Sequence, residues 1–203
     1  MPKIVHELGN LKLSKESEKI SFLIANKSGS YFSLSDSENL SRYQGLFYYN
    51  KGKMNKIIDD ISTDLEVNKI INNGSLIERH YNNAYEEFFM PDKKDVLLYY
   101  SENLNKIKIT LDIRDVFDFD TQNRNYNIEK ESGCIVVSYT KDNYKMFLAI
   151  STNGLKYIKE DKWVKKEYNY DKKRNSEPNT LYVYEALSIA LKKKSFMCFS
   201  YST

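Results

Sequence analysis

Lys106–Ile113 has the sequence KIKITLDI, in which polar and aliphatic residues alternate without a break. Successive side chains of a β-strand point to opposite faces of the sheet. The alternation therefore places Ile107, Ile109, Leu111 and Ile113 on one face and the polar side chains on the other. This segment is predicted to be a strand with one buried and one polar face.

Shorter runs of the same kind lie on both sides of this segment, separated by polar residues. The predicted strands are Ile20–Ala25, Ser30–Leu34, Gly45–Tyr49, Ser75–Tyr81, Glu86–Met90 and Val96–Ser101 before it, and Tyr126–Glu129, Cys134–Tyr139, Lys145–Ser151 and Trp163–Tyr168 after it. Aromatic residues, 14% of the chain, favour pleated and half-buried surfaces. Many short strands with polar punctuation are typical of a sandwich or barrel. We expect residues 1–203 to form one mainly β domain, an antiparallel, supersandwich-like β-sandwich with little helix.

Three segments leave the local structure open. The aliphatic residues of Ile57–Leu65 fit either a helix or a strand. Near the end of the sequence, Leu187–Leu191 and Phe196–Phe199 favour a closing hairpin around a lysine turn, with a short helix over Tyr184–Lys192 as the alternative. The polar segment Lys165–Thr180 is expected to be a long surface loop, either a plain connection or a functional one.

The charge balance argues against nucleic acid as a partner. The chain has 31 Lys and Arg against 28 Asp and Glu, a net charge of +3, and its basic runs are short. Nucleic-acid binders usually carry a basic stripe, because phosphate neutralisation supplies most of their affinity. The apolar runs fall far short of the ~20 residues that span a bilayer, so no membrane partner is expected. Because no secretory signal opens the chain, we predict a cytoplasmic protein with Cys134 and Cys198 as buried free thiols rather than a disulfide.

Catalytic and cofactor motifs are absent from the sequence. It contains no Gly-rich phosphate loop and no Gly-x-Ser-x-Gly turn. His6 and His80 have no His or Cys neighbours at metal-ligand spacing. Carboxylates such as Asp59-Asp60 are plentiful and are expected to be solvated, whereas glycoside hydrolysis needs two at a set separation. We expect no catalytic residue, no metal and no cofactor in this chain.

Three groups of residues are candidates for ligand binding. Arg42, Tyr43 and Gln44 bring a guanidinium, a phenol and an amide together before an apolar strand, and these groups suit sugar hydroxyls. The alternative is that Arg42 ties a loop to backbone carbonyls. Arg114 ends the alternating strand among acidic residues, where a local ion pair is the alternative to a ligand. Trp163 precedes the polar segment and is either a core residue or a sugar platform.

Several of these motifs are similar to those of a known family. Ile24–Tyr31 (IANKSGSY) followed by Ser41–Leu46 (SRYQGL) resembles the N-terminal domain of bacterial and archaeal glycogen debranching enzymes of the amylo-alpha-1,6-glucosidase type. That family opens with a T-N-G-x-G-G-Y turn and an R-Y-H-G-L loop. Leu111–Asp115 looks like the family's D-x-R strand end, and Trp163–Arg174 with Tyr182–Ala186 is similar to its late acidic loop.

The resemblance extends from about Ser21 to Thr203, with departures inside the motifs. Gln44 stands where the family has His, and Ser28 and Ser30 stand where it prefers Gly. In the family this domain is a β-sandwich packed against an (α/α) barrel that carries the catalytic acids, and nothing here resembles that barrel. The resemblance implies a non-catalytic N-terminal part of a larger α-glucan hydrolase, or a free-standing relative, with α-glucan or the catalytic barrel as partner. The alternative is a stand-alone protein-interaction or carbohydrate-binding module without a hydrolase partner.

Overall fold

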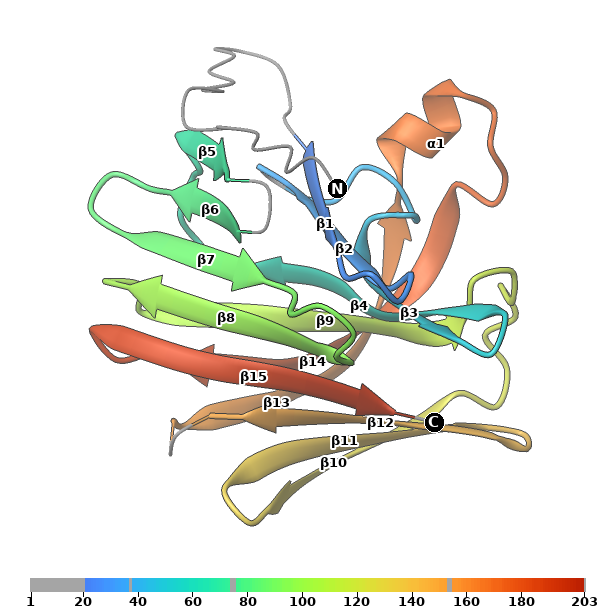
Figure 1. Cartoon of the computed structure of the whole chain (residues 1–203). Coiled ribbons are helices and arrows are strands. Elements are labelled where there is room, and N and C mark those ends of the chain that lie inside the picture. Colours follow the sequence, from blue (N-terminus) through green and yellow to red (C-terminus); the bar gives the residue numbers. More distant parts are fainter. Residues whose placement is uncertain (1–20, 37, 74–75, 153–154, 203) are drawn as a thin grey trace, which may run out of the picture.

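The computed structural model describes residues 21–36, 38–73, 76–152 and 155–202, and it confirms the predicted antiparallel β-sandwich with little helix. Within these residues the strands form one sheet of seven strands and one of eight, which pack together (Figure 1). The one helix that they contain, α1 (Asn169–Lys173), has five residues. Ile20 and Ser75, predicted as strand residues, and His6 lie outside the described residues.

The spatial order of the strands differs from their order in the sequence. From one edge to the other, the seven-stranded sheet consists of β1 (Ser21–Ala25), β2 (Tyr31–Ser35), β3 (Gly45–Asn50), β4 (Lys53–Ser62), β9 (Lys106–Asp115), β14 (Thr180–Ala190) and β13 (Tyr157–Glu167). The eight-stranded sheet consists, from the edge that lies against β13, of β10 (Asn125–Glu131), β11 (Cys134–Lys141), β12 (Tyr144–Ser151), β15 (Lys194–Ser202), β8 (Val96–Glu102), β7 (Tyr85–Phe89), β6 (Leu76–His80) and β5 (Lys69–Asn72).

Strand β9 shows how the alternating sequence builds the core. Ile107, Ile109, Leu111 and Ile113 are fully buried in the cluster shared by both sheets. Removing one such side chain from water contributes about 1.5–3 kcal/mol. The polar side chains between them point the other way, to the face of the seven-stranded sheet that is turned away from the core. We call this the outer face of that sheet.

The first ambiguous segment, Ile57–Leu65, continues strand β4 as far as Ser62 and contains no helix, so its helical alternative is wrong. Ile57, Ile58 and Ile61 are all buried in the core, although Ile57 and Ile58 would face opposite ways in a regular strand. The register between β4 and β9 shifts between Lys56 and Ile58 and again between Ile58 and Asp60. Such bulges re-aim side chains, and here they let consecutive isoleucines reach the core.

The predicted closing hairpin is wrong, although both of its strands exist. β14 pairs with β9 and β13, whereas β15 pairs with β8 and β12 in the other sheet. Residues 191–193 therefore carry the chain from one sheet to the other, and the alternative helix over Tyr184–Lys192 is wrong as well. Alternation indicates which face of a strand is buried, but it does not identify the strand's neighbour.

The polar segment Lys165–Thr180 is only partly a loop. Its first residues end β13, α1 follows, and Thr180 begins β14. Tyr168 and Asp171 within it are fully buried, so the segment packs onto the protein. The polar composition of this segment predicted a solvated loop. The prediction failed because its buried polar side chains are paired with other polar and charged groups of the protein instead of with water. β5 and the first half of β13, with their largely exposed residues, were not predicted either.

Gly45 fixes how β3 meets β4. Its φ of +118° lies in a region that residues with a side chain rarely adopt. A Cβ at this position would lie 2.1 Å from the carbonyl oxygen of Ile58 and 3.0 Å from that of Asp59. Gly45 is the glycine of the SRYQGL motif. The close approach of the two strands therefore gives a structural reason for that glycine.

Gly45→Ala is expected to destabilise the protein by more than about 2 kcal/mol, because it adds backbone strain and a clash with the Ile58 carbonyl. Gly52→Ala is the matched control, since Gly52 also has a positive φ, +82°, but a Cβ there would meet nothing within 4 Å. Urea denaturation of both variants is the measurement. Equal losses of unfolding free energy would contradict the role of the close approach.

Candidate functional site

The outer face of the seven-stranded sheet divides into a covered and an open half. Residues 38–44 of the β2–β3 connection, residues 116–124, and residues 168–176 around α1 pack over buried charged side chains of the sheet. We call this arrangement the covered layer. The other half, over β4, β9, β14 and β13, is open and forms a cavity that we call the outer groove.

Arg42 lies in the covered layer, 3% exposed and bonded to backbone carbonyls. Its Nη1 donates to the carbonyl oxygens of Ser176 and Pro178, each at 2.8 Å. Its backbone N–H donates to Asp171 Oδ2 at 2.8 Å, and its Nη1 lies 3.8 Å from the same oxygen. This is the geometry of a loop tie, the alternative to ligand binding that the sequence left open. A direct role for Arg42 in ligand binding stays a prediction.

Both the oxygen and the nitrogen of the Gln44 side-chain amide form hydrogen bonds, with the β2–β3 connection and with the end of β2. Its Oε1 accepts from the backbone N–H groups of Leu40 at 2.7 Å and Ser41 at 3.1 Å, and its Nε2 donates to Ser35 Oγ at 2.8 Å. Tyr43 is 36% exposed, and its hydroxyl accepts from the neighbouring guanidinium at 3.0 Å. Of these motif residues, Tyr43 therefore presents the most surface to a ligand.

A fully buried carboxylate, Asp59, holds the covered layer on the sheet. Its Oδ1 accepts from Lys56 Nζ at 2.5 Å and from the Tyr168 hydroxyl at 2.6 Å, and its Oδ2 accepts from Lys166 Nζ at 2.7 Å. Burial alone would raise the pKa of Asp59, but the charges of Lys166 and Lys56 outweigh it and hold that pKa below its usual range. Lys56 Nζ also donates to the carbonyl oxygen of Arg42 at 3.0 Å, so this ion cluster reaches the SRYQGL loop.

Arg114 is buried in the same layer, with 1% exposure. Its Nε donates to Asp112 Oδ2 at 2.9 Å and its Nη1 to the carbonyl oxygen of Val116 at 2.7 Å. The ion pair expected as the alternative for Arg114 is therefore present. Its guanidinium lies 5.0 Å from the ring centre of Phe119, and the guanidinium of Arg42 lies 5.4 Å from the same ring. The fold thus brings the two predicted arginines against one aromatic side chain.

Trp163 lies apart from these residues, at the β13 edge of the sandwich. Its ring centre lies 5.5 Å from that of Tyr126 on β10 and 5.4 Å from that of Tyr184 on β14. Tyr126 and Tyr184 themselves stack across the two sheets at 4.4 Å. Trp163 is 40% exposed, so it packs on this pair and also keeps an open surface. It is not part of the covered layer.

The outer groove has a volume of about 450 Å³. The charged and hydroxyl residues that line it include Glu38, Asp60, Lys108, Thr110, Lys166 and Glu185. Thr110 on β9 pairs with Asp60 on β4 and with Glu185 on β14, so these three side chains form a row across three strands. Val164 and Val183, paired on β13 and β14, supply an apolar part of the lining. The sequence alone did not reveal this groove, because its residues come from strands that are distant in the sequence.

Asp60 differs electrostatically from its neighbour Asp59. It is 6% exposed, its Oδ1 forms no hydrogen bond, and its Oδ2 lies 3.7 Å from Lys166 Nζ. Burial is the main reason why the pKa of Asp60 is raised; Lys166 opposes this shift and Asp59 adds to it. The expectation that these carboxylates are solvated is therefore wrong for both. The signal that could have revealed them is their place inside the apolar run IIDDI.

In the described part of the chain, no three His, Cys, Asp or Glu residues are grouped so that they could hold a metal ion. His80 Nε2 lies 2.6 Å from Glu78 Oε2. Cys134 and Cys198 are free, as predicted, but half-buried rather than buried. They lie opposite Ser151 on the two sides of β12, and two strand spacings, about 9–10 Å, are too far for a disulfide.

No protein-family model and no curated protein matches this chain. The described residues include no helix with the length and apolar character needed to cross a membrane. What the structure establishes is therefore a two-sheet antiparallel β-sandwich with a polar groove on one outer face.

Arg42→Ala is expected to lower the free energy of unfolding by at least about 2 kcal/mol, because it leaves buried carbonyls without a donor and removes a charge beside buried Asp171. Arg174→Ala is the matched control. Arg174 contacts the same carboxylate at 2.8 Å, but its side chain is 52% exposed, so its loss should cost about 1 kcal/mol or less. Denaturant melts of both variants test this. If Arg42→Ala leaves the free energy of unfolding unchanged, Arg42 does not tie the loop.

The ion cluster of Asp59 predicts loss of stability in acid. The pKa of Asp59 is lower in the folded protein than its ordinary value of 3.8, so its stabilising contribution is complete above that value and is lost as the pH falls below about 4. Asp59→Asn should destabilise the protein at neutral pH and should flatten the dependence of unfolding free energy on pH below about 4. Urea melts between about pH 2.5 and 7 measure both effects. If the unfolding free energy of the variant depends on pH below about 4 as steeply as that of the parent, this dependence arises from other carboxylates.

Proposed function

We propose that this chain is a non-catalytic β-sandwich domain of a glycogen debranching enzyme-like α-glucan hydrolase, which positions glucan in the outer groove and supports the catalytic barrel. The family assignment comes from the IANKSGSY and SRYQGL motifs. The observation that carries the glucan-binding part is the row formed by Asp60, Thr110 and Glu185 on the floor of the groove.

The polar residues of the groove have the hydrogen-bonding capacity that sugars require. Each sugar hydroxyl both donates and accepts, so a glucan site needs acceptors and donors side by side. Glu185 and Lys108 supply one of each, 3.6 Å apart, with 21% and 36% of their side chains exposed. Thr110, between these two residues and Asp60, adds a hydroxyl that can either donate or accept a hydrogen bond. The side chains of Lys108 and Glu185 are partly exposed and available to a ligand, whereas the amide of Gln44 is buried and bonded.

The shape and apolar lining of the groove also suit a sugar. Its volume of about 450 Å³ is within the range of small-molecule sites, about 300–1,000 Å³. Val164, which is half-buried, offers an apolar surface to the C–H groups of a pyranose ring. Specificity in such sites comes from a few well-placed polar groups beside an apolar wall.

The predicted motif residues support this groove from the covered layer. Lys166 lines the groove and also donates to Asp59, whose other oxygen holds Lys56 under the SRYQGL loop. In this proposal Arg42, Gln44 and Arg114 are positioning residues that fix the wall of the site. Tyr43 and Trp163, with their exposed surfaces, remain candidates for direct contact with glucan or barrel.

The test is titration of the pure chain with maltoheptaose, followed by calorimetry or NMR. We expect saturable binding at micromolar to millimolar ligand. Glu185→Gln and Thr110→Val should each weaken it by about 3- to 30-fold, because each removes a hydrogen bond worth roughly 0.7–2 kcal/mol. Glu131→Gln, on the exposed part of β10 in the other sheet, is the control and should bind like the parent. Absence of binding by the parent at millimolar maltoheptaose would end the glucan proposal.

A protein-interaction module is the second candidate, favoured by an aromatic row on the eight-stranded sheet. The rings of His80 and Tyr85, of Tyr85 and Tyr100, and of Tyr100 and Phe196 follow one another at 5.5, 5.7 and 4.6 Å. Phe196 is 60% exposed. Phe196→Ser separates the two candidates, because it should leave maltoheptaose affinity unchanged. Loss of that affinity would instead place sugar binding on this row.

A further inference from the structure

The eight-stranded sheet is apolar on both of its faces, not only on the face that packs against the core. Strands β8, β11, β12 and β15 contain the near-continuous apolar runs VLLYY, CIVV, MFLAI and FMCF. In each run every second side chain is buried, and the residues between them point outward and are half-buried or exposed. An antiparallel sheet with one face in water usually alternates apolar and polar residues, whereas continuous apolar runs are typical of strands that are buried on both faces.

The outward residues of these strands join those of β7 and β6 in a continuous band of apolar and small side chains. The strand register places one row across six strands, formed by Cys134, Ser151, Cys198, Leu98, Phe89 and Leu76. The row on one side of it contains Val136, Ala149, Ser200 and Val96, and on the other side Phe196 is paired with Tyr100. We call these residues the outer band. Within it, Leu98 is 37% and Phe196 60% exposed.

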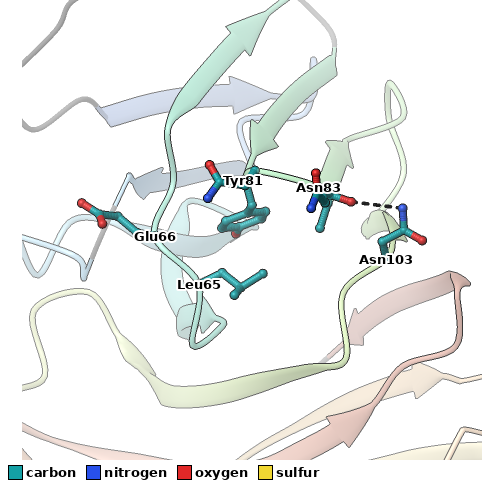
Figure 2. A pocket seen from close by; sticks show the side chains of 7 residues that line it. Leu65, Glu66, Tyr81, Asn83 and Asn103 are labelled. Atoms are coloured by element: carbon teal, nitrogen blue, oxygen red, sulfur yellow. Dashed lines mark hydrogen bonds between the residues drawn. The ribbon is translucent and has the colours of Figure 1, made fainter.

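The outer band is separate from the covered layer and from the cavities described for this chain. The helix α1 and residues 38–44 and 116–124 pack on the seven-stranded sheet. Figure 2 shows a cavity of about 340 Å³ beside residues 81–84, which connect β6 to β7, and its lining shares no residue with the outer band. The outer groove shares none either. Small-molecule sites are concave, so a broad sheet face of this kind fits a partner that is broad and apolar itself.

The area of this face is sufficient for a stable dimer. Each residue on one face of a sheet covers about 32 Å², because strands lie about 4.8 Å apart and alternate residues about 6.7 Å apart. The outward positions of β11, β12, β15, β8, β7 and β6 therefore cover roughly 700 Å² in one copy, or about 1,400 Å² in two copies that face each other. Stable protein interfaces bury about 1,200–2,000 Å².

The two halves of the outer band are complementary in side-chain size. The half on β11, β12 and β15 carries mainly small residues, namely Cys134, Val136, Ala149, Ser151, Cys198 and Ser200, and the half on β8, β7 and β6 carries mainly large ones, namely Leu98, Tyr100, Phe89 and Leu76. A two-fold axis parallel to the strands, between β15 and β8, sets each half against the opposite half of a second copy. Large side chains then meet small ones, and Phe196, the large residue of β15, meets the ring of Tyr100.

The charged residues beside the axis also fit this arrangement. Glu102 on β8 accepts a hydrogen bond from the Tyr100 hydroxyl at 2.9 Å, and its Oε2 lies 3.6 Å from Lys194 Nζ on β15. Lys194 and Glu102 are paired across the two strands that flank the axis. The axis therefore places each lysine opposite the glutamate of the second copy as well, so both charges enter the interface with partners.

We propose that this chain forms a symmetric dimer through the outer band, with the two eight-stranded sheets packed face to face about this axis. Two sheets that pack in this way align their strands at about −30°. The aromatic row that ends in Tyr100 and Phe196 then has a second copy of this chain as its partner. The proposal does not rest on glucan binding, because the outer groove lies on the other sheet.

The test is the mass of the pure chain in solution, measured by sedimentation equilibrium over about 1–100 µM. We expect a dimer, and a melting temperature that rises with protein concentration because association is linked to folding. Leu98→Glu should raise the dissociation constant of the dimer by at least about 100-fold, because each dimer would then bury two unpaired carboxylates. Leu98 is 37% exposed, so the variant should fold, and its circular dichroism spectrum should match that of the parent.

Ile158→Glu is the matched control, because Ile158 is 68% exposed on β13, an edge strand of the seven-stranded sheet, and it should dimerise like the parent. If Ile158→Glu dissociates the dimer and Leu98→Glu does not, the copies associate edge to edge and the proposal is wrong. A parent chain that stays monomeric throughout this concentration range would overturn it as well, whatever other protein that monomer binds. Both variants should bind maltoheptaose as the parent does, so failure of this proposal is distinguishable from failure of the glucan proposal.

Discussion

The ionised carboxylate of Asp59 is the interaction on which the outer half of this structure depends. It is fully buried and accepts hydrogen bonds from β4, from β13 and from Tyr168 just after β13. Its backbone oxygen also accepts from Asn39 in the β2–β3 connection. A buried charge is tolerated only when it is fully paired, so these partners must stay in place together. Through its carboxylate and its backbone oxygen together, Asp59 thus fastens three segments that are distant in the sequence.

The neighbouring Asp60 shows how a change of one residue along the strand reverses the electrostatics. Two lysines surround Asp59 and favour its charge, whereas Asp60 has one lysine at 3.7 Å and an oxygen without a donor. The first carboxylate belongs to the architecture and the second lies where the outer groove meets a second cavity. The bulges in β4 make this division possible, because they change the direction of consecutive side chains.

The strand content was predictable because period-two alternation is a local property, clear in Lys106–Ile113 and Cys134–Tyr139. Strand neighbours were not, because pairing partners are set by the whole sheet, as the separation of β14 from β15 shows. The site was predicted only in part. Arg42 and Arg114 stood out by composition, but their burial follows from loops and strands that meet only in the folded chain. Asp60 and Lys166 were missed for the same reason.

The passage of the chain from β14 into the other sheet has a consequence for its synthesis. β15 lies between β12 and β8 and joins β10–β12 to β5–β8. Until the ribosome has delivered β15, both β8 and β12 are edges with unpaired backbone N–H and C=O groups. A nascent chain in this condition can pair with another such chain, as partly folded intermediates with open strand edges do. Of the strands in the eight-stranded sheet, β15 comes last in the sequence, and its arrival covers both open edges and completes the sheet.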